Sequence, residues 1–236
     1  MNMPHQPGRE NEFEAILFQT IHKKLNQKTS DGIKFHDAIL PVFQETLEFS
    51  DSIVQNLEKN GQSPKVACRS GCNYCCHSQV NIIPIEALLI SAFIKTDFTV
   101  TQVSALNAEI SQIHLLTAGK TLEQLYAIKG DLPCLFLMKG KCSIYKMRPS
   151  ICRSWNSFDS KSCKTAYNSV DYRSPVIGSQ ARNFVFGTTR SLFGQLSKAF
   201  SLQSETLLLP DAMSDCLNNS DPIGQWARGC DVFRYA

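Results

Sequence analysis

The 236-residue sequence contains no apolar run long enough to cross a lipid bilayer. Its longest run, residues 85–94, is about half of the ~20 residues that a transmembrane helix needs, and it carries Glu86. The first eleven residues are polar and lack the charged-then-apolar pattern of a signal peptide. We therefore expect no membrane partner and a cytoplasmic location, where thiols stay reduced.

A large excess of charge is also absent. The chain has 24 Lys and Arg residues against 21 Asp and Glu, a net charge of +3, which is too small to indicate a nucleic-acid partner by itself. No internal repeat or low-complexity tract is present, so a repeat array is not expected. An apolar fraction of 43% and a charged fraction of 19% are typical of a globular domain.

Apolar residues at helical spacing predict that most of the chain is α-helical. The expected helices span residues 11–26, 35–57, 84–93, 103–116, 122–128, 149–152, 162–170, 177–200 and 210–217. Pro41 either kinks the second helix or marks its true start. A short strand or extended link is expected at residues 79–83, and Lys139-Gly140 predicts the turn of a tight β-hairpin between residues 135–138 and 142–145.

These elements predict a mainly α fold: a single helical domain with a small β-hairpin and cysteine knuckles around a metal core. Within it we expect four parts along the chain. These are a disordered tail (residues 1–10), a helical hairpin packed on the core (11–61), the cysteine-cluster metal-binding domain (62–174) and a C-terminal helical extension of that domain (175–236). The apolar end at residues 224–236 should dock on the protein.

Four of the ten cysteines lie within nine positions. They are Cys68, Cys72, Cys75 and Cys76. The two-residue gap between Cys72 and Cys75 is the spacing of a metal knuckle, and Gly71 permits the tight turn before it. Side chains of adjacent residues diverge. Cys75 and Cys76 therefore serve two centres, or one binds metal while the other packs, or a larger cluster accepts both.

A second set of four cysteines follows a long helical stretch. They are Cys134, Cys142, Cys152 and Cys163. The first two flank the expected hairpin, which would bring them together, and the other two begin expected helices, where free backbone N–H groups favour a thiolate. Thiolates bind zinc and iron–sulfur clusters strongly. Eight thiols make either two four-cysteine sites or one site with spare thiols, and the ion is either zinc or iron.

Acidic residues are scarce around both sets. Between Cys134 and Cys163 the one acid is Asp159, whereas six residues are basic. The six are Lys139, Lys141, Lys146, Arg148, Arg153 and Lys161. A four-thiolate zinc site carries a net charge of about −2, and nearby cations lower the cost of keeping its thiols deprotonated. The alternative interpretation is a solvated basic surface.

Other interpretations of these residues stay open. Free cysteines also pack as small apolar side chains, and this is our interpretation of the isolated Cys216 and Cys230. His77 is either a ligand or a residue near the ligands. His114 has no candidate partner nearby in the sequence. Arg148 and Arg153 either neutralise the centre, which we favour, or orient an anionic substrate.

Two stretches of the chain resemble the YkgJ-like cysteine-cluster family, whose domain is described as zinc- or iron-chelating. The first is Cys68-x3-Cys72-x2-Cys75-Cys76, with three residues in the first gap where the family often has two. The second runs from Cys134-Leu-Phe-Leu through Gly140-Lys-Cys142-Ser-Ile-Tyr to Arg148-Pro-Ser-Ile-Cys152-Arg153. The resemblance covers residues 66–168. It implies metal binding and no particular reaction.

Three functional hypotheses follow. In the first, the metal holds the fold together and nothing is turned over. In the second, the protein is an enzyme with an open metal position, since one branch of the family looks like the flagellin lysine N-methylases; no glycine-rich methyl-donor loop follows a strand here. In the third, the protein passes zinc or iron to a protein client.

Overall fold

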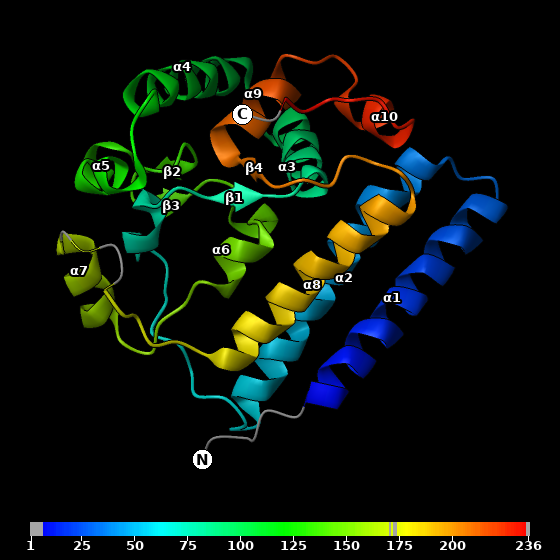
Figure 1. Cartoon of the computed structure of the whole chain (residues 1–236), viewed down its shortest axis with the longest axis horizontal. Coiled ribbons are helices and arrows are strands. Elements are labelled where there is room, and N and C mark those ends of the chain that lie inside the picture. Colours follow the sequence, from blue (N-terminus) through cyan, green and yellow to red (C-terminus); the bar gives the residue numbers. More distant parts are fainter. Residues whose placement is uncertain (1–6, 170, 172–173, 235–236) are drawn as a thin grey trace.

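The computed structural model describes residues 7–169, 171 and 174–234, and most of this chain is helical (Figure 1). The ten α-helices in the described residues are α1 (Pro7–Ser30), α2 (Phe35–Lys59), α3 (Pro84–Asp97), α4 (Val100–Thr117), α5 (Leu122–Ala127), α6 (Ser150–Ser154), α7 (Ser160–Asn168), α8 (Gln180–Ala199), α9 (Leu209–Leu217) and α10 (Pro222–Ala227). The prediction of a mainly α protein is confirmed.

Short extended and 3-10 segments connect these helices. The strands are β1 (Asn81–Ile82), β2 (Leu137–Met138), β3 (Lys141–Cys142) and β4 (Leu207–Leu208), and the 3-10 helices are η1 (Tyr74–His77), η2 (Lys129–Asp131) and η3 (Tyr145–Met147). Strands β2 and β3 form the expected hairpin, and β1 pairs antiparallel with the distant β4. The small hairpin predicted from Lys139-Gly140 is therefore confirmed.

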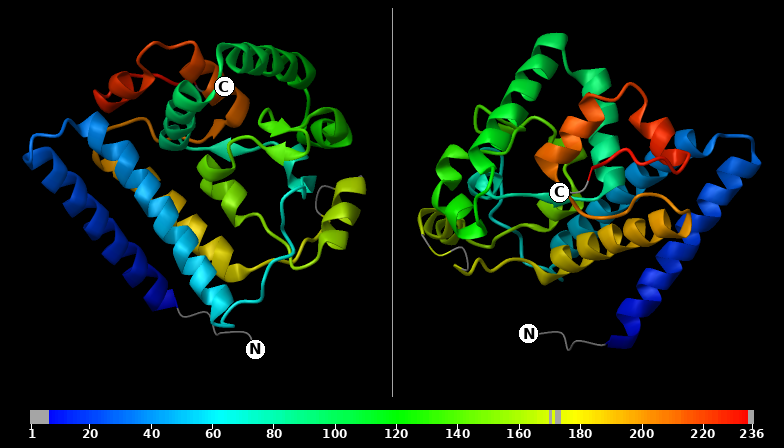
Figure 2. Two further views of the ribbon diagram at one scale, coloured as in Figure 1. Left: turned by 180° about the vertical axis from the view of Figure 1, so that it is seen from behind. Right: turned by 45° about the horizontal axis from the view of Figure 1, so that its top comes forward.

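Three long helices form one side of the molecule. Figure 1 and the two views of Figure 2 show α8 beside α2, with α1 against the outside of this pair. Phe43 of α2 and Phe193 of α8 are both fully buried, and their rings meet edge to face with centroids 4.2 Å apart. Ser50 and Thr189 share a hydrogen bond of 2.8 Å across the same contact. The apolar stripes predicted in the sequence are thus the packing faces of these helices.

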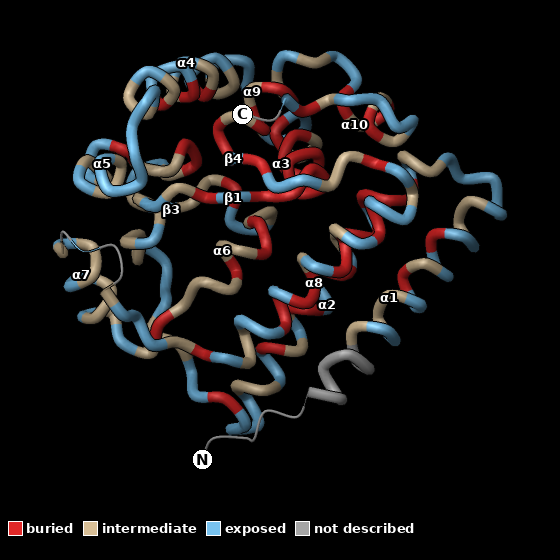
Figure 3. The backbone as a smooth tube through the Cα atoms, viewed as in Figure 1, coloured by how far each residue is buried: buried red, intermediate tan, exposed pale blue. Residues whose placement is uncertain are grey.

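A second group of helices, α3, α4, α9 and α10, packs at the other end of the molecule, and Figure 3 shows that most of α9 and the first two turns of α3 are buried. The C-terminal segment, from residue 224 onward, packs against the rest of the protein. Trp226 of α10 has no exposed surface, and its indole N–H donates to the Gln203 carbonyl at 3.0 Å. Phe233 is also buried. The segment from residue 224 therefore docks as expected; Tyr235 and Ala236 lie outside the described residues.

Several boundaries differ from the predicted ones. Helix α1 begins at Pro7, so the expected disordered tail of residues 1–10 is wrong for residues 7–10, and residues 1–6 lie outside the described part. Pro41 lies inside α2, because the helix starts at Phe35. The helix expected at residues 162–170 ends at Asn168, and Val170 lies outside the described residues. Helix α10 was not predicted. No helix within the described ranges combines the length and apolarity needed to span a membrane.

Candidate metal centre

The first cysteine segment is a turn followed by a short 3-10 helix. The backbone N–H of Cys72 donates to the Arg69 carbonyl at 3.0 Å, and Gly71 occupies the third position of this turn with φ +88°. Only glycine adopts such a left-handed conformation without strain. After the turn, η1 carries Cys75 and Cys76, and the Cys76 N–H donates to the Asn73 carbonyl at 2.9 Å. The expected knuckle is therefore built from two consecutive tight turns.

The second segment is positioned by the hairpin. Lys139 and Gly140 both have positive φ, +50° and +74°, as a two-residue type I′ turn requires. The register pairs Leu137 with Cys142. The N–H of Cys134, just before β2, donates to the Cys76 carbonyl at 2.6 Å. This backbone hydrogen bond joins the two cysteine segments directly.

Helix α6 supplies Cys152, and a buried carboxylate fixes the start of this helix. Glu86 in the first turn of α3 is 1% exposed. One of its carboxylate oxygens accepts from the N–H of Ile83 at 3.1 Å, and the other accepts from the N–H of Ser150, the first residue of α6, at 2.7 Å. Glu86 therefore ties the N-termini of two helices together and sets the position of Cys152 relative to the core.

Six of the eight predicted cysteines line a single cavity of about 420 Å³. They are Cys72, Cys75, Cys76, Cys134, Cys142 and Cys152. Three of them come from each of the two cysteine segments, which are separated in the sequence by α3, α4 and α5. Cys75 is exposed and the other five are half-buried. The structure therefore brings together thiols from both predicted sets and leaves them reachable from solvent.

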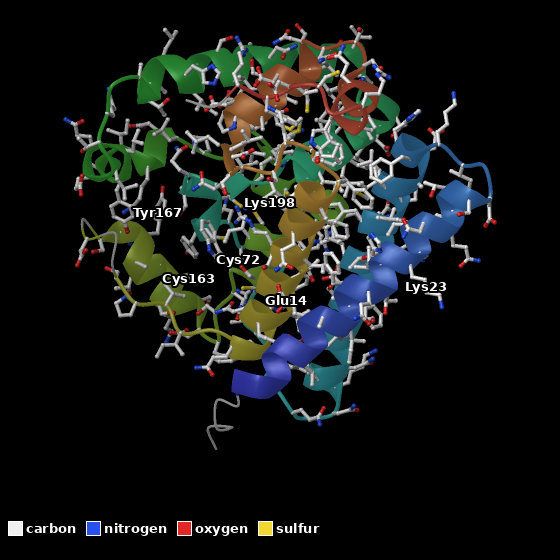
Figure 4. The ribbon with its side chains drawn as sticks, turned by 45° about the vertical axis from the view of Figure 1, so that its right-hand side comes forward. Glu14, Lys23, Cys72, Cys163, Tyr167 and Lys198 are labelled. Atoms are coloured by element: carbon white, nitrogen blue, oxygen red, sulfur yellow. The ribbon has the colours of Figure 1, made fainter. Side chains whose placement is uncertain are left out.

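The remaining two predicted cysteines lie beside this cavity. Cys163 on α7 lines a smaller neighbouring cavity of about 180 Å³, which Cys75 also lines. In Figure 4, Cys163 and Tyr167 lie on α7 with Cys72 nearby, and the charge of Cys163 acts on the Cys72 thiol. Cys68 is exposed and lines neither cavity, although it is close enough to act on Cys72 in the same way.

His77 faces the smaller cavity with a defined ring orientation. Its Nδ1 lies 3.2 Å from the Lys129 carbonyl oxygen, which accepts only, so Nδ1 carries the proton. The ring also packs against Tyr167 with centroids 5.0 Å apart. In the neutral ring the lone pair is then on Nε2, which is the arrangement that many metal-binding histidines have. Both interpretations of His77 given above remain predictions.

The two arginines of the second segment have different surroundings. Arg153 is buried: its guanidinium pairs with Asp51 of α2 and donates to the carbonyls of Lys146 and Arg148, the latter at 2.7 Å from Nε. Arg148 lines the large cavity, with its guanidinium carbon 3.9 Å from the centroid of the Tyr145 ring. Arg153 is thus a structural residue, and only Arg148 faces the cavity thiols.

The electrostatics favour protonated thiols when no metal is bound. Burial raises the pKa of Cys134 to about 12 and also raises the pKa of Cys142 and Cys152. A hydrogen bond with the Cys76 side chain raises the pKa of Cys75. The Arg148 charge acts in the opposite direction on Cys75, Cys142 and Cys152. Arg148 is therefore the cation that helps these sulfur atoms become thiolates.

The donor set fits a soft metal centre. No three His, Cys, Asp or Glu side chains in the described parts of the chain already stand together as the ligands of one ion. The cavity nevertheless offers six sulfur atoms, and no carboxylate among the described residues lines it. Sulfur-only sites of this kind take zinc or iron–sulfur clusters, whereas magnesium and calcium require oxygen. The thiols would have to draw together as the metal binds.

The sequence analysis missed two groups that position the site. Glu86 follows Pro84 by two residues, a helix-start signal that predicts its hydrogen bond to Ile83, but nothing in the sequence indicates Ser150 as its second partner. Likewise, the partner of Arg153 is Asp51, about a hundred residues earlier. His114 was expected to have no partner nearby in the sequence; its Nε2 lies 2.7 Å from Asp211 of α9.

Comparison with known families agrees with this geometry. Residues 67–170 match the CxxCxxCC family model, described as a putative zinc- or iron-chelating domain. The match spans α3 to α7 with all eight predicted cysteines, and it confirms the resemblance over residues 66–168. No curated protein and no solved structure matches the chain. Zinc or iron chelation is therefore the function that the matched domain indicates.

Proposed function

We propose that this protein holds zinc or an iron–sulfur cluster in the large cavity through thiolates from both cysteine segments. The observation that carries the proposal is the meeting of three cysteines from residues 72–76 with three from residues 134–152 around one space. The six cavity cysteines are the main candidate ligands, and Cys68 and Cys163 are further candidates at its edge. A bound metal would supply the positive charge that stabilises the thiolates.

The residues around the thiols would support such a centre in two ways. Arg148 offsets part of the negative charge of a four-thiolate site, which is about −2 with zinc. The hairpin, η1 and α6 hold the cysteine backbones from three directions, and Glu86 anchors α6 from behind. The protein thus contributes a partly preorganised set of thiols, and metal binding completes it.

The accessibility of the cavity favours a reachable centre over a sealed structural one. Cys75 is exposed and its five cavity partners are half-buried, so a chelator or a protein client can reach the thiols from solvent. This observation supports the hypothesis in which the centre exchanges its metal with a protein client. Rapid loss of the metal to a competing chelator, with the protein remaining folded, would support delivery to a client.

The test is to purify the protein without oxygen, count iron, zinc and sulfide per chain, and record the visible spectrum. Brown protein with sulfide indicates a cluster, and colourless protein with zinc indicates a zinc site. We expect Cys75→Ser and Cys134→Ser to lower the metal content at least fivefold. Cys230→Ser is the control, because Cys230 is exposed and lines neither cavity.

Two results would contradict the proposal. One is a wild-type protein that contains neither metal after anaerobic purification and binds neither when they are supplied. The other is metal content that falls equally in Cys230→Ser and in Cys134→Ser, because the metal would then not depend on the cavity. Circular dichroism of each variant shows whether a loss of metal reflects a loss of the fold.

A further inference from the structure

We propose that the large cavity also binds a small organic carboxylate, with its carboxylate on Arg148 and an apolar body against the cavity wall. This inference rests on the proposed function to the extent that the ligand would lie beside the metal centre. It adds to that function a substrate or ligand class and a residue that recognises it.

The first support is the guanidinium of Arg148. Its Nε is buried and has no hydrogen-bond partner in the described structure. A buried donor without a partner is unfavourable, so the side chain gains when an acceptor arrives. The Tyr145 ring, 3.9 Å from the guanidinium carbon, holds the planar group in place. Arg153 shows the contrast, because Asp51 and two carbonyls occupy its guanidinium.

The second support is the size of the cavity. One water takes a share of about 30 Å³ in the liquid, and pockets for small organic ligands measure roughly 300–1,000 Å³. The cavity, at about 420 Å³, falls in the range for organic ligands.

The third support is the chemistry of the wall. Apolar side chains line the cavity together with the thiols: Val80, Phe136, Leu137, Ile144, Trp155 and Leu209. Such a surface favours an apolar body, whereas the planar fork of Arg148 matches the two oxygens of a carboxylate. No acidic side chain among the described residues lines the cavity, so no carboxylate of the protein competes for Arg148. Arg69 and Lys141 also line the cavity, and the guanidinium of Arg148 is distinguished by its contact with the Tyr145 ring.

The experiment is calorimetric titration of the anaerobically purified, metal-loaded protein with three probes. Benzoate carries both the carboxylate and an apolar ring, acetate carries the carboxylate alone, and benzyl alcohol carries the ring alone. We expect benzoate to bind at least tenfold more tightly than either of the others. Arg148→Gln should weaken benzoate binding at least tenfold, and Lys141→Gln, which removes another cation of the cavity lining, less than threefold.

Arg148→Lys separates recognition of the ligand from neutralisation of the metal centre. Lysine keeps the positive charge but lacks the planar fork, so metal content should be unchanged while benzoate binding weakens. If the wild-type protein carries its metal but does not bind benzoate, or if Arg148→Gln binds it equally well, the inference is wrong and the proposed function stands. If Arg148→Lys binds benzoate like the wild type, recognition by the fork is wrong. An absence of metal in the wild type would instead contradict the proposed function.

Discussion

Glu86 holds the start of α6, the helix that carries Cys152. Its carboxylate is 1% exposed, and both oxygens accept backbone N–H groups, one at the start of α3 and one at the start of α6. Negative charge at helix N-termini is stabilising, because the first N–H groups of a helix have no partner within it. One carboxylate therefore accepts hydrogen bonds from backbone N–H groups at the N-termini of two helices.

We predict that Glu86→Gln lowers the free energy of unfolding by about 2 kcal/mol, since hydrogen bonds to charged groups contribute roughly 1.5–3 kcal/mol and the amide N–H₂ would face a backbone donor. Urea denaturation followed by circular dichroism measures the change. The control is Glu48→Gln on the exposed side of α2, expected to stay within about 0.5 kcal/mol. Equal stability of both variants would show that Glu86 does not join the helices as described.

At the residue scale, six of the eight cysteines singled out in the sequence line one cavity, Cys68 and Cys163 do not, and the sequence did not indicate which residues support them. The cysteine spacing and Gly71 carried local information, because turns depend on a few consecutive residues. The partners of Glu86 and Arg153 lie 64 and 102 positions away. Such contacts depend on how helices pack, and no local pattern records them. The adjacent pair Cys75 and Cys76 lies on a 3-10 helix, and both residues reach the same cavity.

At the element scale, the long helices, the hairpin and the short helices α5 and α6 were predictable, whereas the β1–β4 pairing and α10 were not. Helices α2 and α8 present apolar stripes over many turns, and the Lys139-Gly140 turn is a recognisable hairpin signal. The β1–β4 pair has two residues in each strand, and its partners Asn81 and Leu208 are far apart in the sequence. A strand of two residues is too short to show the alternation of apolar and polar residues that identifies strands in a sequence. Helix α10 has six residues, and Gly224 in its middle interrupts the short apolar pattern.

The hairpin turn gives a prediction at this scale. We expect Gly140→Ala to destabilise the protein by about 1 kcal/mol, because Gly140 has φ +74° and a side chain in that conformation costs roughly 1–2 kcal/mol. The added methyl itself has room, with Asn73 Nδ2 at 3.7 Å. Gly140→Ala should also weaken metal binding, since the turn positions Cys142.

Gly187→Ala is the matched control substitution, and we expect it to raise the stability of the protein where Gly140→Ala lowers it. Gly187 lies inside α8, with no atom within 4 Å of the position of an added methyl. Alanine in a helix interior is more stable than glycine by roughly 0.5–1 kcal/mol, so this variant should gain stability. Thermal denaturation of the two variants side by side compares them. A change of the same sign in both would contradict the role given to the turn.

At the scale of the whole molecule, the burial of a thiol makes the free energy of unfolding depend on pH. Cys216 is fully buried on α9, away from the cavity, and burial raises its pKa to about 12 from the ordinary 9.0. Above pH 9 the unfolded chain therefore releases a proton that the folded chain keeps. Fewer protons on the unfolded state mean that the free energy of unfolding falls as pH rises from about 9 towards 12.

We expect this fall in the wild-type protein, measured by urea denaturation between pH 8 and 10.5 with chelator and reductant present. Cys216→Ala should be less stable at pH 8 and should show a shallower fall. Cys230→Ala, which changes an exposed cysteine, should keep the wild-type slope. Identical slopes in all three proteins would mean that Cys216 does not hold its proton through burial.

The arrangement of the molecule explains why both cysteine segments reach one cavity. Helix α3 and β1 fix the end of the first segment, the hairpin follows the helical stretch α4–α5, and α6 packs against both α8 and β1. The pair formed by Asp51 and Arg153 connects this region to α2. The cavity is therefore lined by the two cysteine segments with Leu209 of α9, and contacts of α6 with α8 and of Arg153 with α2 hold it in place.

The most direct measurement of the central claim is X-ray absorption at the metal edge of the anaerobically purified protein. We predict a first shell made mainly of sulfur, at about 2.3 Å if the metal is zinc, and a loss of sulfur in Cys134→Ser but not in Cys230→Ser. Two results would contradict the account. One is a first shell of only nitrogen and oxygen. The other is a sulfur shell that is the same in the wild type and in the double variant that carries Cys134→Ser and Cys75→Ser.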